Sequence, residues 1–301
     1  MSRTVAVGFD GSPESRAAAD WAAREAKLRA LPLRLVNVWE IASASMAEAP
    51  LLGADTQQHW SERIPREAAE RIRARHPGVD VTVEQRTGWA GEALVDVAKE
   101  SEMLVLGSRG LSGVSGFMIG SVGMAVVAHA ERPVVLVRAG ELAATKHTRN
   151  PSANPSADTA CRSVVLGVDT KRPDDSLIEF AFDAAERRAT TLHAVHSWTV
   201  PPYDWYGPST NQRLNAQLAG TEAAALGTAL RPWRQKFPAV EVVEDSRPVR
   251  AADLLLDASL DASLVVVGRR TRRSPLGSHT GPITHAVLHH CTVPVAVVSH
   301  S

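Results

Sequence analysis

The sequence predicts an α/β fold made of two tandem domains, each a five-stranded parallel sheet with helices on both faces. Short apolar runs alternate with helical segments along the chain, as they do where crossover helices join parallel strands. The whole pattern then occurs a second time. An offset of roughly 160 residues separates matching positions of the two halves, a sign of a duplicated domain: Asp10 and Asp169, Trp39 and Trp198, Gly107 and Gly268, and Pro133 and Pro294.

The first half opens on Val5–Phe9, an apolar run suited to a buried parallel strand. Ser12 and Pro13 follow, a good N-cap and a residue that the first helical position tolerates. Pro65 is expected to bend or split the second helix. The remaining expected elements are, in order, a helix around Trp21, a strand over Leu33–Trp39, a helix over Gln57–Arg75, a strand over Val79–Glu84, a helix over Gly91–Lys99, a strand over Met103–Leu106, a helix over Ser121–Ala130 and a strand over Val134–Val137.

The domain boundaries come from the repeat and from a change in composition. Residues 1–140 form the expected first domain and residues 161–301 the second. Between them, residues 141–160 contain two prolines, little apolar content and no periodicity, which is typical of a linker. The second half begins again at Val164–Asp169 and closes with Val293–Val298.

Composition limits the function classes. The 301 residues contain 33 basic and 33 acidic side chains, so the formal net charge is zero. The chain as a whole therefore has no general electrostatic attraction to nucleic acid or to an anionic membrane. No signal peptide and no apolar run of about 18 residues is visible. Cys161 and Cys291 cannot form a disulfide framework, so both are expected to stay reduced in a cytoplasmic protein.

The stretch Val105–Val122 carries the functional signal and reads VLGSRGLSGVSGFMIGSV. Glycines let backbone amides approach a ligand closely, and the helix expected to begin at Ser121 leaves amides unpaired at its positive end. Such a loop between strand and helix is a candidate phosphate site. A plain surface loop without a ligand is the alternative interpretation.

Two spacings in this stretch resemble a known signature. Two residues separate Gly107 from Gly110, and nine residues separate Gly110 from the pair Gly120-Ser121. This spacing is similar to the ATP-binding signature of the universal stress protein family. With the VGFDGS start and the PVVLV end, both halves resemble domains of that family, in a tandem arrangement like that of actinobacterial members. The resemblance implies an adenine nucleotide α-hydrolase-like sheet in the order 3-2-1-4-5, with ATP at the switch point.

The resemblance also implies roles for residues of the first half. Asp10 is expected at the adenine and ribose end, Val38 against adenine, and Ser121 at the phosphates, where its hydroxyl could also reach a bound Mg²⁺. Helix capping for Asp10 and core packing for Val38 remain alternatives. The implied ATP-binding residues are Gly8, Phe9, Asp10, Val38, Gly107, Arg109, Gly110, Gly120, Ser121 and Val122.

The loop lacks the parts of a phosphoryl-transfer enzyme. It has no GK[ST] ending and no lysine between Gly107 and Gly120, so it fits nucleotide binding better than turnover. No catalytic residue is assigned, and at most slow ATP hydrolysis is expected. His285 and His289 are four apart on one expected helix, but no third ligand stands at metal-site spacing, so no metal site is expected from protein side chains alone.

The second half departs from the signature. Thr271 replaces the second glycine, Pro282 replaces the serine, and Ser197 stands where Val38 stands in the first half. Proline removes an amide donor and the hydroxyl together. A weak second site at most is therefore expected, and the second domain serves mainly as a pseudo-dimer partner. Its residues would be Asp169, Gly268 and Gly281, beside a basic cluster that either adds charge or is simply solvated: Arg269, Arg270, Arg272, Arg273 and His279.

Three functions compete. The first is an ATP-binding regulatory module of the stress response, with an unknown protein partner and a homodimer as further expectations. The second is an ATP-independent interaction protein with both pockets empty. The third, an enzyme such as an ATP-pyrophosphatase-type ligase, needs an SGGxDS-type loop where this chain has FDGSPES. For the ATP-binding regulatory module, the resemblance also implies that the strands Val134–Val137 and Val295–Val298 pair with each other.

Overall fold

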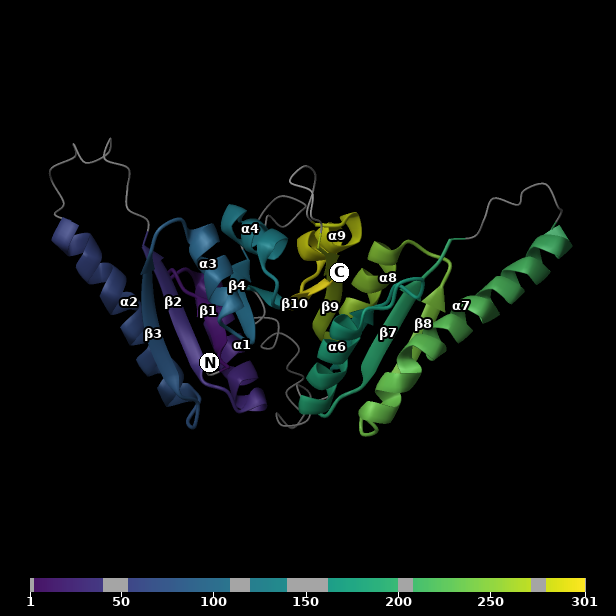
Figure 1. Ribbon diagram of the computed structural model, residues 1–301, viewed down its shortest axis with the longest axis horizontal. Helices are drawn as coiled ribbons and strands as arrows, with labels where there is room; N and C mark the ends of the chain where they lie inside the picture. The colour runs from purple at the N-terminus through teal and green to yellow at the C-terminus, as the bar shows by residue number, and fades with distance from the viewer. Residues whose placement is uncertain are drawn as a thin grey trace, which may run out of the picture. The chain divides into compact units, whose positions relative to one another are not determined.

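The computed structural model describes residues 3–39, 54–108, 120–139, 162–199, 208–271 and 280–300. The chain divides into two compact units, Met1–Thr148 and Arg149–Ser301, called domain 1 and domain 2 below and described one at a time (Figure 1). The expected linker, residues 141–160, lies outside the described residues, as does Cys161. Pairing of Val134–Val137 with Val295–Val298 stays a prediction.

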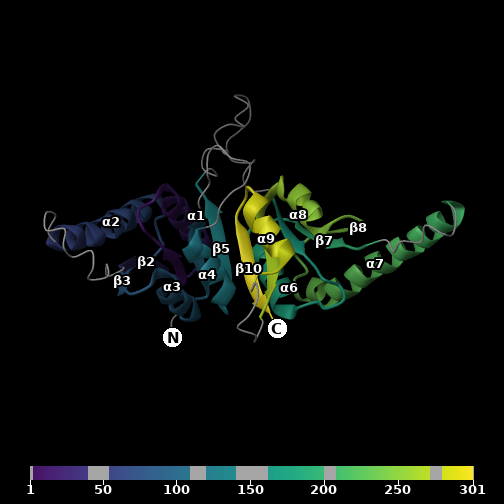
Figure 2. The same ribbon diagram turned by 90° about the horizontal axis from the view of Figure 1, so that it is seen from above.

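Domain 1 is a five-stranded parallel sheet in the order β3-β2-β1-β4-β5, as expected. Helices α1 and α2 pack together on one face and α3 and α4 on the other (Figure 2). The elements are β1 (Val5–Gly8), α1 (Pro13–Arg29), β2 (Leu33–Trp39), α2 (Ala54–Arg75), β3 (Val81–Thr87), α3 (Ala90–Lys99), β4 (Met103–Ser108), α4 (Ser121–His129) and β5 (Val134–Arg138).

Helix α1 begins as the sequence predicts. The Ser12 hydroxyl accepts a hydrogen bond from the Ser15 amide at 3.1 Å, and Pro13 occupies the first helical turn. Ala17, Ala18 and Trp21 are buried against the sheet. The cap and the apolar stripe therefore fix where α1 starts and which face it turns inward.

Helix α2 is continuous through Pro65, so the expected split of this helix does not occur. Proline removes one amide donor from the helix, which is a local loss. Pro65 is itself buried, and Ala68, Ala69 and Ile72 continue the buried stripe beyond it. Packing of that stripe outweighs the missing hydrogen bond.

Two strands end later than their apolar runs indicate. Strand β4 continues beyond Leu106 because Gly107 and Ser108 pair with Val137 and Arg138 of β5. Strand β3 begins at Val81 rather than Val79 and runs to Thr87, which is paired with Trp39 at the end of β2. In both cases the neighbouring strand, rather than local hydrophobicity, sets the end.

Domain 2 repeats this architecture, with all its strands parallel and in the order β8-β7-β6-β9-β10. Helices α6 and α7 pack together, as do α8 and α9. The buried thiol of Cys291 follows α9, the core position expected for it. The elements are β6 (Ser163–Gly167), α6 (Asp175–Arg187), β7 (Leu192–Ser197), α7 (Pro208–Lys236), β8 (Val242–Arg247), α8 (Ala251–Ser259), β9 (Ala262–Arg270), α9 (Pro282–His290) and β10 (Val295–His300).

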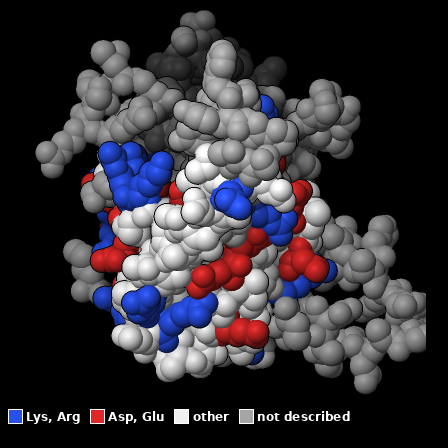
Figure 3. All heavy atoms as spheres, turned by 90° about the vertical axis from the view of Figure 1, so that its right-hand side faces the viewer, with Lys and Arg blue, Asp and Glu red and all other residues white. Residues whose placement is uncertain are grey.

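Acidic and basic side chains alternate on the face drawn in Figure 3, which carries no broad field of one sign. Several of the charges on domain 2 are matched, such as Arg234 with Glu244 at 2.7 Å and Lys236 with Glu179 at 2.6 Å. Among the described helices, none combines the length and apolar character needed to cross a membrane.

Candidate functional site

Domain 1 has a cavity of about 230 Å³ at the carboxyl ends of its central strands. Strand β1 lies between β2 and β4, and the chain leaves β1 toward one face and β4 toward the other. Such a switch point leaves a crevice that helices do not cover. The ends of β1, β2 and β4 and the first turns of α1, α3 and α4 line this crevice.

The cavity brings together every described residue of the predicted ATP site. These residues come from four separate segments of the chain: Gly8, Phe9, Asp10, Val38, Gly107, Gly120, Ser121 and Val122. Arg109 and Gly110 lie outside the described residues. The geometry makes a shared site feasible, and the nucleotide-binding role of these residues stays a prediction.

Asp10 lies in a tight turn after β1. Its carboxylate accepts a hydrogen bond from the Ser12 amide at 2.9 Å, and Gly11 between them has a φ of +83°, which favours glycine. Partial burial opposes ionisation of Asp10, but hydrogen bonds from Ser12 and Ser15 outweigh it and hold the carboxyl pKa below its usual value. Since Ser12 is the cap of α1, the Asp10 carboxylate organises the turn ahead of that helix.

Asn37 is a residue that our sequence reasoning missed. Its side-chain amide donates to the Phe9 carbonyl at 2.9 Å and holds the loop after β1 against β2. The available signal was a single amide side chain inside the otherwise apolar run around Val36 and Val38. A polar group in such a run needs a partner, and here that partner is the loop that carries Asp10.

The first turn of α4 is the strongest anion-binding feature of the cavity. Gly120 is its N-cap, with φ −61° and ψ 155°, and no side chain caps the helix. Among the described residues, no atom lies within 4 Å of where a Cβ at Gly120 would be, so this N-cap position is uncrowded. Ser121 is exposed and adds a hydroxyl. Uncapped amides, the positive end of the helix dipole and free space suit a phosphate group.

Gly107 has a structural role in addition to the predicted one. A Cβ there would lie 2.5 Å from the backbone carbon of Glu14 and 2.7 Å from the amide nitrogen of Ser15. Glycine therefore lets the first turn of α1 pack directly on β4. Gly107 still lines the cavity, but its close approach is to protein backbone.

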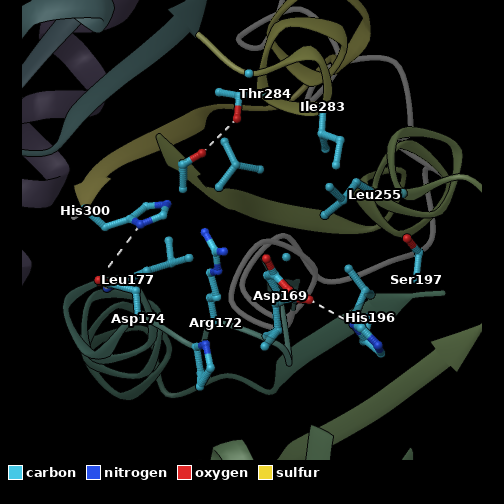
Figure 4. Close-up of a pocket in the computed structure, with 18 of the residues that line it drawn as sticks. Asp169, Arg172, Asp174, Leu177, His196, Ser197, Leu255, Ile283, Thr284 and His300 are labelled. Atoms are coloured by element: carbon cyan, nitrogen blue, oxygen red, sulfur yellow. Dashed lines mark hydrogen bonds and ion pairs between the residues drawn. The ribbon is translucent and has the colours of Figure 1, made fainter. Parts of the chain in front are cut away.

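Domain 2 has its own cavity, of about 450 Å³, at the corresponding place in its sheet (Figure 4). Asp169, Gly268 and Gly281, the residues of the predicted weak second site, all line it. Arg270 of the basic cluster lines it too, whereas Arg272, Arg273 and His279 lie outside the described residues. The altered signature has therefore not closed this cavity.

The first turn of α9 differs from that of α4. Gly281 is again an N-cap without a side-chain cap, but Pro282 then removes an amide donor. Thr284, where domain 1 has Gly123, is buried and donates its hydroxyl to the Gly268 carbonyl at 2.8 Å. The first turn of α9 therefore has one amide donor fewer than that of α4 and no counterpart of the Ser121 hydroxyl.

His196 of domain 2 matches Asn37 of domain 1. Its Nδ1 donates to the Val168 carbonyl at 3.0 Å, so the loop after β6 is tied to β7 as the loop after β1 is tied to β2. Its Nε2 lies 3.0 Å from a carboxylate oxygen of Glu222 and 3.2 Å from the Thr170 hydroxyl. The fold therefore uses one polar side chain at this strand position to hold the site loop in each domain.

The rings of His285 and His289 do lie together, with centroids 4.3 Å apart and planes tilted by 34°, as their spacing on α9 allows. Within the described ranges, however, no three histidine, cysteine, aspartate or glutamate side chains are grouped to hold a metal ion.

Both halves of the chain match one family model, described as the universal stress protein family, over residues 1–138 and 161–299. A universal stress protein of Mycolicibacterium smegmatis is 30% identical over 304 residues, covering 98% of this chain and 96% of that protein. A crystal structure of a universal stress protein from Archaeoglobus fulgidus covers 100% of both chains with a TM-score of 0.68 and 17% identity, which is a likeness of fold. Another universal stress protein, solved in complex with cAMP, is 28% identical and covers 46% of this chain and 98% of its own, with a TM-score of 0.35.

Proposed function

The chain belongs to the universal stress protein family, and from that premise we propose that it is a stress-response regulatory module whose domain 1 binds ATP. The observation that carries the proposal is the uncapped first turn of α4, which opens into the cavity at the switch point of the sheet. Backbone amides that face open space at a helix N-terminus stabilise a phosphate chain.

The described lining fits a nucleotide along its length. Phe9 and Val38 supply apolar surface for a base, and the ionised Asp10 carboxylate accepts hydrogen bonds from ribose hydroxyls. The amides that follow Gly120 and the Ser121 hydroxyl donate to phosphate oxygens. Ser121 is also the side chain that would reach a Mg²⁺ ion carried with the phosphates.

We propose that domain 1 holds its nucleotide and does not turn it over. Among the described residues that line the cavity, Asp10 is the only ionisable side chain. Phosphoryl transfer needs positive charge on the transferred group and a residue that orients the attacking nucleophile. Occupancy of the site would instead change how the chain associates with a regulatory protein partner or with a second copy of itself. A cytoplasmic location stays a prediction.

A matched pair of variants tests the nucleotide site. Gly120 and Gly281 are both helix N-caps where an added Cβ would meet no atom of a described residue within 4 Å. Gly120→Leu and Gly281→Leu therefore introduce the same change in the two domains. Ligands released from the freshly purified full chain are identified by mass spectrometry. We expect an adenine nucleotide at about one per chain, an affinity loss of about tenfold or more in Gly120→Leu, and little change in Gly281→Leu.

Circular dichroism shows whether each variant is folded. Absence of nucleotide from the purified chain, together with no ATP uptake in equilibrium dialysis, would favour the ATP-independent interaction protein. Equal losses in the two variants, or two tight ATP sites per chain, would contradict a site confined to domain 1.

A further inference from the structure

We propose that the domain 2 cavity is a separate binding site for a small amphipathic organic anion, with an apolar body and one carboxylate or phosphate monoester group. Two guanidinium groups and one imidazole at its rim would hold the anionic group, in contrast to the helix amides of domain 1. Such a site is additional to the nucleotide site of domain 1 and does not depend on it.

Two of these groups lie side by side at the end of the sheet. Arg270 and His300 are the last residues of β9 and β10 and are paired in the parallel register. Gly268 lines the cavity, and residues two apart on a strand share a face, so Arg270 lies on the cavity side as well. A Cβ at Gly268 would lie 2.8 Å from Nε2 of His300, so the imidazole extends over the cavity floor.

The third group comes from a different element. Arg172 lies in the connection between β6 and α6 and reaches into the cavity on the side where His300 lies (Figure 4). No described residue makes a hydrogen bond or an ion pair with its guanidinium. A guanidinium at the edge of a cavity offers a planar pair of donors, which suits a carboxylate or a phosphate group.

Domain 1 lacks two of these groups. Its connection from β1 to α1 is the shorter Phe9–Ser12, against Val168–Asp174 in domain 2, and so has no counterpart of Arg172. Ala139 stands where domain 2 has His300. The cationic side chains are thus present in the domain that lacks the amide and hydroxyl of Ser121.

The same cavity disfavours a triphosphate. Asp174 caps α6, accepting from the amides of Ser176 and Leu177 at 3.0 and 3.1 Å, and it lies 4.0 Å from Nδ1 of His300. Asp169 adds a second carboxylate to the lining. These two carboxylates balance the charges of Arg172 and Arg270, so the cavity has no surplus positive charge for a chain of phosphates, whereas a single anionic group can pair directly with a guanidinium.

Much of the remaining lining is aliphatic, and the cavity is large enough for a bicyclic ring system. Its volume of about 450 Å³ is within the range of small-molecule sites. The aliphatic side chains that form this part are Leu177, Ile178, Leu254, Leu255, Val267 and Ile283. An apolar body would be buried here while its charged group meets Arg172, Arg270 and His300.

Titration calorimetry on the full chain tests the proposal with three probes of one shape. They are 1-naphthyl phosphate, 1-naphthoate and uncharged 1-naphthol. We expect at least one of the anions to bind at one site per chain, and 1-naphthol to bind about tenfold more weakly or not at all. Comparing the two anions distinguishes a phosphate monoester from a carboxylate.

Two neighbouring substitutions locate the site. Arg172→Gln removes a charge inside the cavity, whereas Lys171→Gln removes the same charge from an adjacent exposed residue outside the lining. We expect Arg172→Gln to weaken anion binding about tenfold and Lys171→Gln to leave it within about twofold. Arg270→Gln on a separate strand should repeat the loss, with thermal unfolding as the check that each variant is folded.

Four results would overturn the proposal, and the first three concern the naphthyl probes. They are no binding of either anion, equal affinity in Arg172→Gln and Lys171→Gln, and 1-naphthol binding as tightly as the anions. ATP bound at a second site and released by Arg172→Gln would also overturn it, because the cavity would then be a nucleotide site. None of these outcomes depends on whether Gly120→Leu loses nucleotide from domain 1.

Discussion

Gly107 and Gly268 occupy matching positions in the two domains but have different neighbours. A Cβ at Gly107 would overlap the backbone of Glu14 and Ser15, whereas one at Gly268 would meet the side chains of His300 and Leu177. Because backbone cannot move aside as easily as an imidazole ring, we expect Gly107→Ala to destabilise domain 1 by about 1–3 kcal/mol and Gly268→Ala to cost domain 2 less than about 1 kcal/mol. Urea unfolding of the two variants measures this difference, and equal losses would contradict the packing role of Gly107.

His285 provides a residue-level test of pH dependence. Partial desolvation of the His285 ring, together with repulsion from the neighbouring imidazoles of His289 and His290, lowers the pKa of His285 from its usual 6.5. The folded chain then binds this proton less readily than the unfolded chain, so stability is lost as pH falls below about 6.5. Thermal unfolding between pH 8 and pH 5 should show a smaller acid loss in His285→Gln than in the unaltered chain. Parallel curves would show that His285 contributes nothing to it.

Single residues also show what sequence reasoning could and could not find. Asp10, Gly120 and Ser121 line the cavity as predicted, because a turn, a glycine and a helix start each leave a local signature, and their role in binding stays a prediction. Asn37 and His196 were missed because their role depends on a loop that only the folded sheet brings within 3.0 Å. A polar residue within an apolar strand was the available signal, but it names no partner.

At the scale of elements, the two prolines inside helices should behave differently. Pro232 in α7 is exposed, whereas Pro65 in α2 is buried. Replacing Pro232 by alanine restores a backbone donor without losing packing, so we expect it to stabilise domain 2 by about 1–3 kcal/mol. Pro65→Ala gains the same donor but loses buried surface, so its gain should be smaller. Calorimetric unfolding of both variants checks the order, and a larger gain from Pro65→Ala would contradict it.

Element types could be predicted from the sequence, whereas element ends often could not. The Ser12 cap fixed the start of α1 locally, while the ends of β3 and β4 depend on register with β2 and β5. Packing likewise carries α2 through Pro65. Local chemistry therefore predicts an end where a cap is present, and tertiary pairing decides it elsewhere.

At the scale of the whole molecule, duplication was the most predictive feature of the sequence. It indicated both domains and, with the family resemblance, the strand order of both sheets. Loss of Ser121's counterpart at Pro282 predicted a weaker phosphate site, but it did not predict a larger cavity. That cavity depends on where the longer connection before α6 and His300 lie in space, which no linear motif records.

Strands β5 and β10 are edge strands of their own domains. Within its own domain β5 pairs with β4 alone, and β10 pairs with β9 alone, so the sheet order leaves one edge of each strand without a partner from that domain. An apolar edge such as Val134–Val137 tends to add another strand, and the equivalent strand of the duplicated domain belongs to the same chain. We therefore expect the halves to stay together when a protease site placed within residues 141–160 is cut, and to elute from a sizing column like the uncut chain.

Domain 1 produced alone should then form a homodimer through its free edge, and adding domain 2 should convert it to a complex of one copy of each domain. Separate elution of the cut halves would show that the fifth strands do not pair.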